Sequence, residues 1–259
     1  EIFYSFYVNG HHTLDTGEIM PPLGEPEYDV NQVPQKLFLT WNRRYRRHRV
    51  LLVLLLEKLN LIDRSFISFQ KIDAERVSST YEGQIEHLKM DSVGHARGPI
   101  NQMCEDFGYT RDFYSDSLVS LITETNYHQN ECTLTEKSFK PLYNKHPFII
   151  LGVPGALQAI RDMGFKTFSD FWDESYDTLQ DPSHRFMVIK EQIEKIALWN
   201  DQQILEFRRN VKPILDHNYH MFAEPGSVAI SNQIYNHITE NFNKGHAHWC
   251  APHGGCHFE

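Results

Sequence analysis

The chain has 259 residues, of which 41% are hydrophobic, and it carries a formal net charge of -9 at pH 7. This length allows one large domain or two small ones, with enough apolar residues for a core. The longest apolar run is 50–56, whereas a membrane-spanning helix needs about 20 residues. The acidic balance also disfavours a nucleic-acid-binding surface. We therefore expect a soluble globular protein that neither crosses a membrane nor binds nucleic acid.

Four cysteines are too few for a disulfide framework and suit a reducing compartment, so we expect a cytoplasmic location. For a viral protein this would be the host cytoplasm. The chain starts at Glu1 rather than Met, and its first ten residues lack the layout of a secretion signal. We expect further sequence upstream.

Short apolar runs alternate with helical patterns along the middle of the chain, which predicts an α/β fold. The expected strands are at 36–40, 65–69, 117–125, 147–152 and 165–168. The expected helices are at 43–60, 135–144 and 154–164. Strands separated by helices indicate βαβ units, and hence a Rossmann-like parallel sheet that binds ligands at the carboxyl ends of its strands.

Composition divides the chain into four parts. An irregular arm rich in glycine and proline comes first, followed by the Rossmann-like domain, a mainly helical region and a tail rich in histidine and cysteine; their bounds are 1–36, 37–181, 182–242 and 243–259. In the helical region we expect breaks at Pro213 and at the Glu-Pro-Gly of 224–226. Gly152, Pro154 and Gly155 favour a tight turn after a strand.

Five arginines and one histidine fall within 43–49. If Asn42 caps the helix that follows the first strand, these arginines lie in its first turns, where they repel the helix dipole and one another. A bound anion would remove this conflict, because a strand leading into a helix amino terminus is a favourable phosphate site. The alternative is a solvated face paired with carboxylates, such as those of the acidic segment 171–177. That segment could instead bind sugar hydroxyls or a divalent ion.

A second polar cluster follows the strand at 117–125. Glu124 and Asn126 come at its end, and Thr133 with Glu136 forms the pattern of a capping box at the next helix. Lys137 then lies in a first helical turn, where it opposes the dipole as the arginines do. Two cationic helix starts on one sheet edge predict a shared anion.

These segments together resemble the nucleotide-binding half of the α-1,3-fucosyltransferase family, glycosyltransferases of GT-B architecture. The resemblance rests on a strand followed by Trp-Asn and arginines, then on Thr-Glu-Thr-Asn (123–126), Thr-Glu-Lys (135–137) and the strand at 147–152. The same region also resembles glycosyltransferase-like proteins of bacteriophages and other viruses. The likeness covers about residues 37–177.

The resemblance implies a nucleotide-sugar donor whose diphosphate is held by the arginines and by Lys137, with Glu136 on ribose or sugar hydroxyls. The donor-binding residues that it indicates, together with the arginine cluster, are Asn42, Arg43, Arg46, Arg47, Arg49, Glu124, Asn126, Thr135, Glu136 and Lys137. Because a GT-B enzyme needs a second domain for its acceptor, an upstream domain or a protein partner would complete the cleft. The sequence assigns no catalytic base.

Two functions are consistent with this pattern. One is a glycosyltransferase, transferring a hexose from a nucleotide sugar, or the donor-binding domain of one. The other is a non-catalytic virion or assembly protein that keeps a glycosyltransferase-like fold.

The tail has six zinc-type ligands, which are His246, His248, Cys250, His253, Cys256 and His257. Nitrogen and sulfur ligands at this density could bind zinc. The alternative is an unstructured terminus, since no standard finger spacing is matched.

Overall fold

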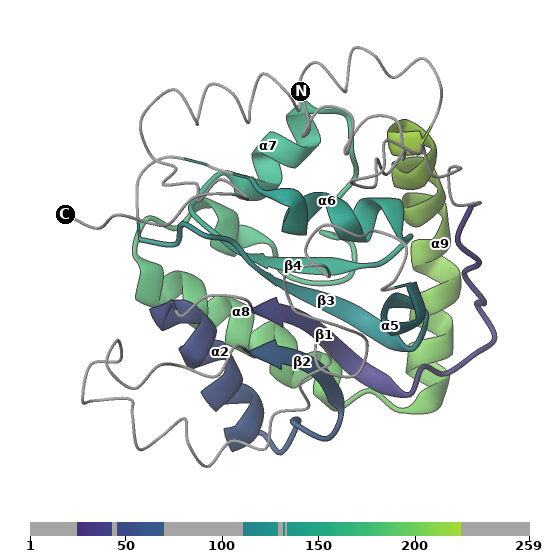
Figure 1. The fold of residues 1–259 in the computed structure, drawn as a ribbon, viewed down its shortest axis with the longest axis horizontal. Coiled ribbons are helices and arrows are strands. Elements are labelled where there is room, and N and C mark those ends of the chain that lie inside the picture. The colour runs from purple at the N-terminus through teal and green to yellow at the C-terminus, as the bar shows by residue number, and fades with distance from the viewer. Residues whose placement is uncertain (1–24, 43–45, 70–110, 129–131, 133, 224–259) are drawn as a thin grey trace, which may run out of the picture.

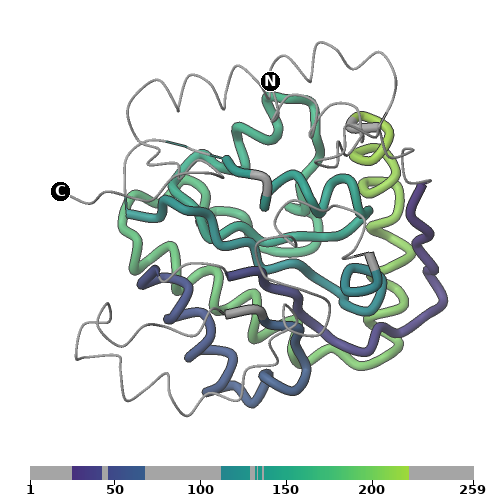
Figure 2. Tube along the Cα trace, viewed as in Figure 1, coloured from purple at the N-terminus to yellow at the C-terminus, as the bar shows by residue number. Residues whose placement is uncertain are grey.

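A computed structural model of the chain describes residues 25–42, 46–69, 111–128, 132 and 134–223 (Figure 2). The predicted zinc ligands, the break at 224–226 and Arg43 lie outside these residues, and the side chain of Glu136 is also not described.

Four parallel strands form the sheet at the centre of the fold (Figure 1). They are β1 (Lys36–Asn42), β2 (Ser65–Phe69), β3 (Ser117–Thr123) and β4 (Phe148–Leu151), in the order β2-β1-β3-β4. The prediction of a parallel α/β sheet with flanking helices is therefore confirmed. β3 is buried at every position because strands lie on both of its sides and helices cover the sheet.

The helices follow the strands along the chain and continue into a helical carboxyl-terminal part (Figure 1). They are α2 (Arg47–Lys58), α5 (Arg111–Ser115), α6 (Glu136–Tyr143), α7 (Ala156–Asp162), the short 3-10 helix η2 (Ser175–Thr178), α8 (Pro182–Ala197) and α9 (Asp201–Ala223). Within the described ranges, no helix is both long and apolar enough to cross a membrane.

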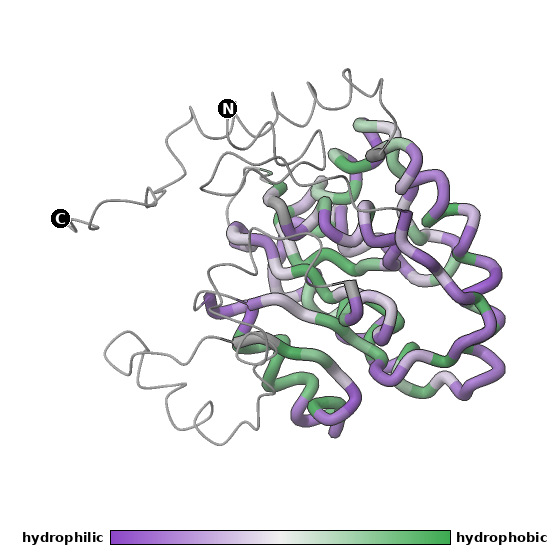
Figure 3. Tube along the Cα trace, turned by 45° about the vertical axis from the view of Figure 1, so that its right-hand side comes forward, coloured by the Kyte–Doolittle hydropathy of each residue, from purple (hydrophilic) through white to green (hydrophobic). Residues whose placement is uncertain are grey.

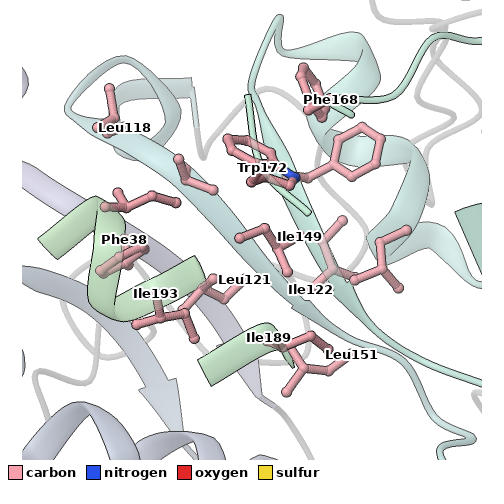
Figure 4. Packing of buried hydrophobic residues seen from close by; sticks show 14 of the residues in the cluster. Phe38, Leu118, Leu121, Ile122, Ile149, Leu151, Phe168, Trp172, Ile189 and Ile193 are labelled. Carbon is pink, nitrogen blue, oxygen red and sulfur yellow. The ribbon is translucent and has the colours of Figure 1, made fainter. Parts of the chain in front are cut away.

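One face of the sheet packs against α8. Leu121 of β3 pairs in register with Ile149 of β4, so both side chains lie on the same face. In Figure 4, Ile189 and Ile193 of α8 point toward these strand residues and toward Phe38 of β1. The carboxyl-terminal helices thus share one hydrophobic core with the sheet.

The opposite face packs against α5. Phe113 of α5 stands edge-on to Trp41 of β1 and to Phe66 of β2, with ring centroids 5.6 and 5.1 Å apart. On the same face the Nδ1 of His146 lies 2.8 Å from the hydroxyl of Ser120. Burial lowers the pKa of His146 to about 3, so this imidazole is neutral in the core. Figure 3 shows the resulting arrangement, with apolar strands inside and polar segments on the outer helices.

The segment that precedes β1 is held by α9. Arg208 donates hydrogen bonds from Nε and Nη2 to the carbonyl of Asp29 at 2.9 and 2.7 Å, and its guanidinium lies 4.3 Å from the centre of the Tyr28 ring. Lys145 adds ion pairs to Glu25 and to Asp216 of α9. The two ends of the described chain therefore meet on one side of the fold.

The helix after β1 begins later than predicted. Asn42 is the last residue of β1, and the amino-terminal cap of α2 is Arg46, which makes no capping side-chain hydrogen bond. The prediction that Asn42 caps this helix is wrong, because the Asn42 carboxamide is used within the sheet. The arginines at 46 and 47 nevertheless remain at the helix start.

The predicted strand at 165–168 does not form. The carboxamide of Asn218 in α9 pairs with both backbone groups of Lys166, at 2.8 and 2.9 Å, and the amide of Phe168 donates to Glu174. Side chains satisfy these backbone groups in place of a neighbouring strand. The aromatic residues that suggested a strand, including Phe165, instead lie in the core.

Pro213 lies inside α9 and does not break it. A proline in a helix interior costs about 3 kcal/mol. Five apolar residues of α9 are buried at helical spacing, which are Ile204, Phe207, Val211, Leu215 and Tyr219. Burial of this stripe offsets the cost of the proline.

We predict that Ile193→Ala destabilises the whole domain by about 2–5 kcal/mol, because Ile193 is fully buried between α8 and the sheet. Urea unfolding followed by circular dichroism measures the change. The matched control is Leu198→Ala, at an 84% exposed residue that follows the same helix, which should change stability by no more than about 0.5 kcal/mol. A separate early transition confined to the helices would contradict the shared core.

Candidate anion-binding site at the carboxyl edge of the sheet

The order of the strands creates a point of divergence between β1 and β3. The chain leaves β1 toward β2 on one side and leaves β3 toward β4 on the other. In open parallel sheets, ligands bind in the crevice outside the carboxyl ends of two such strands. Here the segment that leads to α2 and the segment that leads to α6 depart from this point (Figure 1).

The first turn of α2 is anchored to the end of β3 by two side chains. Nε2 of His48 lies 2.8 Å from the carbonyl oxygen of Glu124, and Nη2 of Arg49 donates to the carbonyl of Thr123 at 3.1 Å. A carbonyl oxygen only accepts, so Nε2 of His48 carries the proton. Both side chains are buried, so Arg49 anchors the helix to the strand.

His48 belongs to a small stack of side chains centred on the ring of Tyr127. Its imidazole lies parallel to the ring of Tyr127 at 5.0 Å, and the guanidinium of Arg185 from α8 lies 4.6 Å from the centre of the same tyrosine ring. Burial, and then the charge of Arg49, lowers the pKa of His48 to about 3, so the imidazole is neutral. Burial also raises the pKa of Tyr127 to about 12.

The carboxylate of Glu124 holds the start of α6. It accepts hydrogen bonds from the amide of Thr135 at 2.9 Å, from the Thr135 hydroxyl at 2.6 Å and from the Ser138 hydroxyl at 2.6 Å. Thr135 is the cap residue of α6, so the predicted capping box that begins at Thr133 is wrong. The buried carboxylate of Glu124, the residue that follows β3, holds this helix start instead, so a negative charge of the chain already lies at the amino terminus of α6.

Asn42 joins the two strands at the same edge. Its Oδ1 accepts from the hydroxyl of Thr123 at 2.7 Å, and its Nδ2 donates to the hydroxyl of Thr40 at 3.2 Å. Asn42 is buried, so it fixes the ends of β1 and β3 relative to each other.

The amino terminus of α7 is likewise occupied by a carboxylate of this chain. Gly155, with a φ of 84°, is the cap residue, as the predicted tight turn requires. The carboxylate of Asp177 accepts from the amides of Leu157 and Gln158 at 2.8 and 3.0 Å. The predicted acidic segment therefore serves the fold through Asp177.

Glu174 of the same segment is also engaged within the fold. It accepts from the Thr167 hydroxyl at 2.7 Å and from Arg161 at 3.2 Å. Burial raises the pKa of Glu174 despite these partners. Arg161 of α7, rather than the cluster at 43–49, is its described cation.

The start of α2 differs from those of α6 and α7. It has no side-chain cap and no acidic residue in its first turn. Arg46 and Arg47 are both exposed there, and Arg47 makes no hydrogen bond or ion pair with any residue that the structure describes. Lys137, half-exposed at the start of α6, donates to the Thr135 hydroxyl at 3.3 Å.

The structure brings most of the predicted donor-binding residues to one edge of the sheet. Asn42, Glu124 and Thr135 are connected through hydrogen bonds at the ends of β1 and β3, and Asn126 is buried close by in the chain. The residues that the sequence analysis missed are His48, Thr123, Tyr127, Ser138 and Arg185. Only His48 had a usable signal, because it is the one histidine within the arginine cluster at 43–49.

Metal binding has no support among the residues described. Within those ranges no group of three or more histidine, cysteine, aspartate or glutamate side chains is arranged to hold a metal ion. The six predicted zinc ligands of the tail lie outside those ranges.

Comparison of the chain with protein-family models, with curated proteins and with solved structures gave no match. The functional interpretation therefore depends on the geometry of the sheet edge and on the sequence resemblance described above.

We predict that the buried neutral state of His48 makes stability depend on pH between about 6.5 and 3. The unfolded imidazole binds a proton near pH 6.5, but in the fold His48 does so only near pH 3. The unfolded state therefore binds more protons in this window, and the free energy of unfolding falls as the pH falls. His48→Gln keeps a donor for Glu124 and does not titrate. It should make the dependence between pH 6 and 5 shallower by roughly 1 kcal/mol per pH unit.

Urea titrations at several pH values measure this slope. His220→Gln, at an exposed histidine of α9, is the control and should leave the slope unchanged. Equal slopes for the wild type and His48→Gln would show that His48 is protonated in the native state.

Proposed function

We propose that this chain is the donor-binding domain of a glycosyltransferase, and that it binds the diphosphate of a nucleotide sugar at the divergence of β1 and β3. The reaction would be transfer of a hexose to an acceptor held by a further domain or partner. Three features of the described residues support this proposal.

The first feature is the position of the basic residues. Arg46 and Arg47 start a helix that leaves the switch point of a parallel sheet, where such folds bind phosphates. Lys137 begins the helix that leaves the neighbouring strand. The Glu124 carbonyl accepts from α2 while its carboxylate accepts from α6, so the two helix starts are held at one strand end.

The second feature carries the proposal furthest. Glu124 and Asp177 supply negative charge to the amino termini of α6 and α7, whereas α2 has two exposed arginines and no acid in its first turn. Like charges at the positive end of a helix are unfavourable by a few tenths of a kcal/mol each. A diphosphate bound at the start of α2 would make the electrostatic free energy of this helix start favourable, because its negative charge attracts both the arginines and the helix dipole.

The third feature is chemical. A sugar nucleotide reacts by losing its diphosphate, and negative charge grows on the leaving oxygen as the glycosidic bond breaks. Arginine and lysine side chains that bind the diphosphate stabilise that charge in the transition state. Arg46, Arg47 and Lys137 would therefore lower the barrier as well as the dissociation constant.

One observation favours a second candidate, a non-catalytic protein that retains a nucleotide-binding sheet. The carboxylates of Glu124, Glu174 and Asp177 accept hydrogen bonds that hold helices and loops in place. Carboxylates engaged in this way are poorly placed to act as a catalytic base. The two candidates differ in turnover. Slow hydrolysis of a bound nucleotide sugar by the full chain indicates a transferase, and binding without any release of nucleoside diphosphate indicates the second candidate.

We predict that at least one of UDP-glucose, GDP-mannose and GDP-fucose raises the melting temperature in a thermal-shift screen. A ligand at a hundredfold excess over its dissociation constant stabilises the native state by about 2.7 kcal/mol. No shift with any nucleotide sugar or nucleoside diphosphate would contradict the proposed function.

We further predict that Arg47→Gln and Lys137→Gln each weaken binding of the same nucleotide sugar about tenfold or more in calorimetry. A charge-assisted hydrogen bond contributes about 1.5–3 kcal/mol. The charge-matched control is Arg209→Gln, at an exposed arginine of α9, which should bind as the wild type does. If Arg47→Gln and Arg209→Gln bound the nucleotide sugar with equal affinity, the proposed site at the start of α2 would be wrong.

A further inference from the structure

His128 is an exposed histidine at the same edge, in the segment that leaves β3. Its ring stands edge-on to that of Tyr127, with centroids 5.2 Å apart and planes at 88°. It makes no hydrogen bond with any residue in the described ranges. In the sequence, His128 is one histidine among fifteen and has no distinguishing pattern.

The rings beneath His128 place it beside the start of α2. Tyr127 stacks on His48, which is the second residue of α2 and follows Arg47 directly. The guanidinium of Arg185 from α8 packs against the same tyrosine ring. Cations from two helices, Arg47 and Arg185, therefore lie near His128, whose ring belongs to the residue type that changes charge near physiological pH.

These neighbours account for the protonation state of the free protein. Partial burial, followed by the charges of Arg47 and Arg185, lowers the pKa of His128. The other titratable groups of this stack, His48 and Tyr127, are both neutral. In the absence of an anion, the imidazole of His128 is mainly uncharged at neutral pH.

We propose that His128 is a further ligand of the bound diphosphate, donating a hydrogen bond to a phosphate oxygen beside Arg47 and taking up a proton as the anion binds. This inference rests on the proposed function, because it requires a diphosphate at the start of α2. It adds a residue from the segment after β3 to the basic residues of the helices.

The expected sign follows from linkage. A phosphate beside His128 favours the charged imidazole, so the pKa of His128 is higher in the complex than in the free protein. The nucleotide sugar then binds most tightly at a pH below the pKa that His128 has in the free protein. Binding weakens as the pH rises through the pKa that His128 has in the complex. Affinity should fall about tenfold for each unit by which binding raises the pKa.

The test is calorimetric titration of the full chain between pH 5.5 and 8 with the nucleotide sugar that gives the largest thermal shift. Each phosphate of a nucleotide sugar carries one ester and one anhydride linkage and so has no second acidic proton, which means that the diphosphate itself does not titrate in this range. We expect the dissociation constant of the wild type to rise with pH. His128→Gln should bind with a pH-independent affinity close to that of the wild type at high pH.

The matched control is His220→Gln. His220 is also exposed and edge-on to a preceding tyrosine, with 5.8 Å between the ring centroids of Tyr219 and His220, but it lies on α9. This variant should keep the pH dependence of the wild type. Proton NMR adds a direct readout, because the imidazole signal missing from His128→Gln should titrate at higher pH when the nucleotide sugar is present.

The outcomes separate the two proposals. Binding whose pH dependence is the same in the wild type and in His128→Gln would overturn the role of His128 and leave the diphosphate site in place. An NMR signal that titrates identically with and without ligand would do the same. Absence of binding to every nucleotide sugar at every pH would overturn both proposals.

Discussion

Glu124 holds together the part of the molecule on which the functional interpretation depends. Its carboxylate binds the first turn of α6, and its main-chain carbonyl accepts a hydrogen bond from His48 in the first turn of α2. Two helices that connect different pairs of strands therefore meet at the last residues of β3. Glu124 helps to set the separation of Arg47 and Lys137, because each belongs to a helix that it anchors.

The three helix starts at this edge are electrostatically different. A helix amino terminus attracts an anion, and a buried carboxylate of the same chain supplies one at α6 and at α7. Hydrogen bonds from backbone amides and hydroxyls hold these two side chains in place. At α2 the neutral His48 occupies the buried position, and Arg46 and Arg47 extend toward solvent. Of these three helix starts, only that of α2 lacks an acid of the same chain, which is why we place the proposed anion there.

Because apolar periodicity reports burial directly, the sequence was sufficient to predict the parallel sheet, its four strands and the helices α2, α6 and α7, but not the short helix α5. It also placed the arginines and Lys137 at helix starts. It could not identify Glu124 as the acceptor at the start of α6, since this residue follows β3, eleven positions before Thr135, and lies outside the local capping pattern. The segment 165–168 was mistaken for a strand. The backbone of Lys166 pairs with the side chain of Asn218, which lies 52 residues further along the chain, and not with a neighbouring strand. Contacts of this kind depend on the tertiary fold and leave no local pattern.

The contact between Arg208 and Asp29 has a consequence for how the protein is synthesised. The two residues are 179 positions apart, and Arg208 belongs to the last described helix. Until α9 has emerged from the ribosome, the segment before β1 lacks its partners. Until α8 has emerged, the sheet face that α8 covers is exposed to solvent. Pairing of distant segments slows folding, since the intervening chain must be ordered first. The nascent protein thus exposes apolar strand surface until nearly all of its core has been translated, a period in which a chaperone would protect it from aggregation.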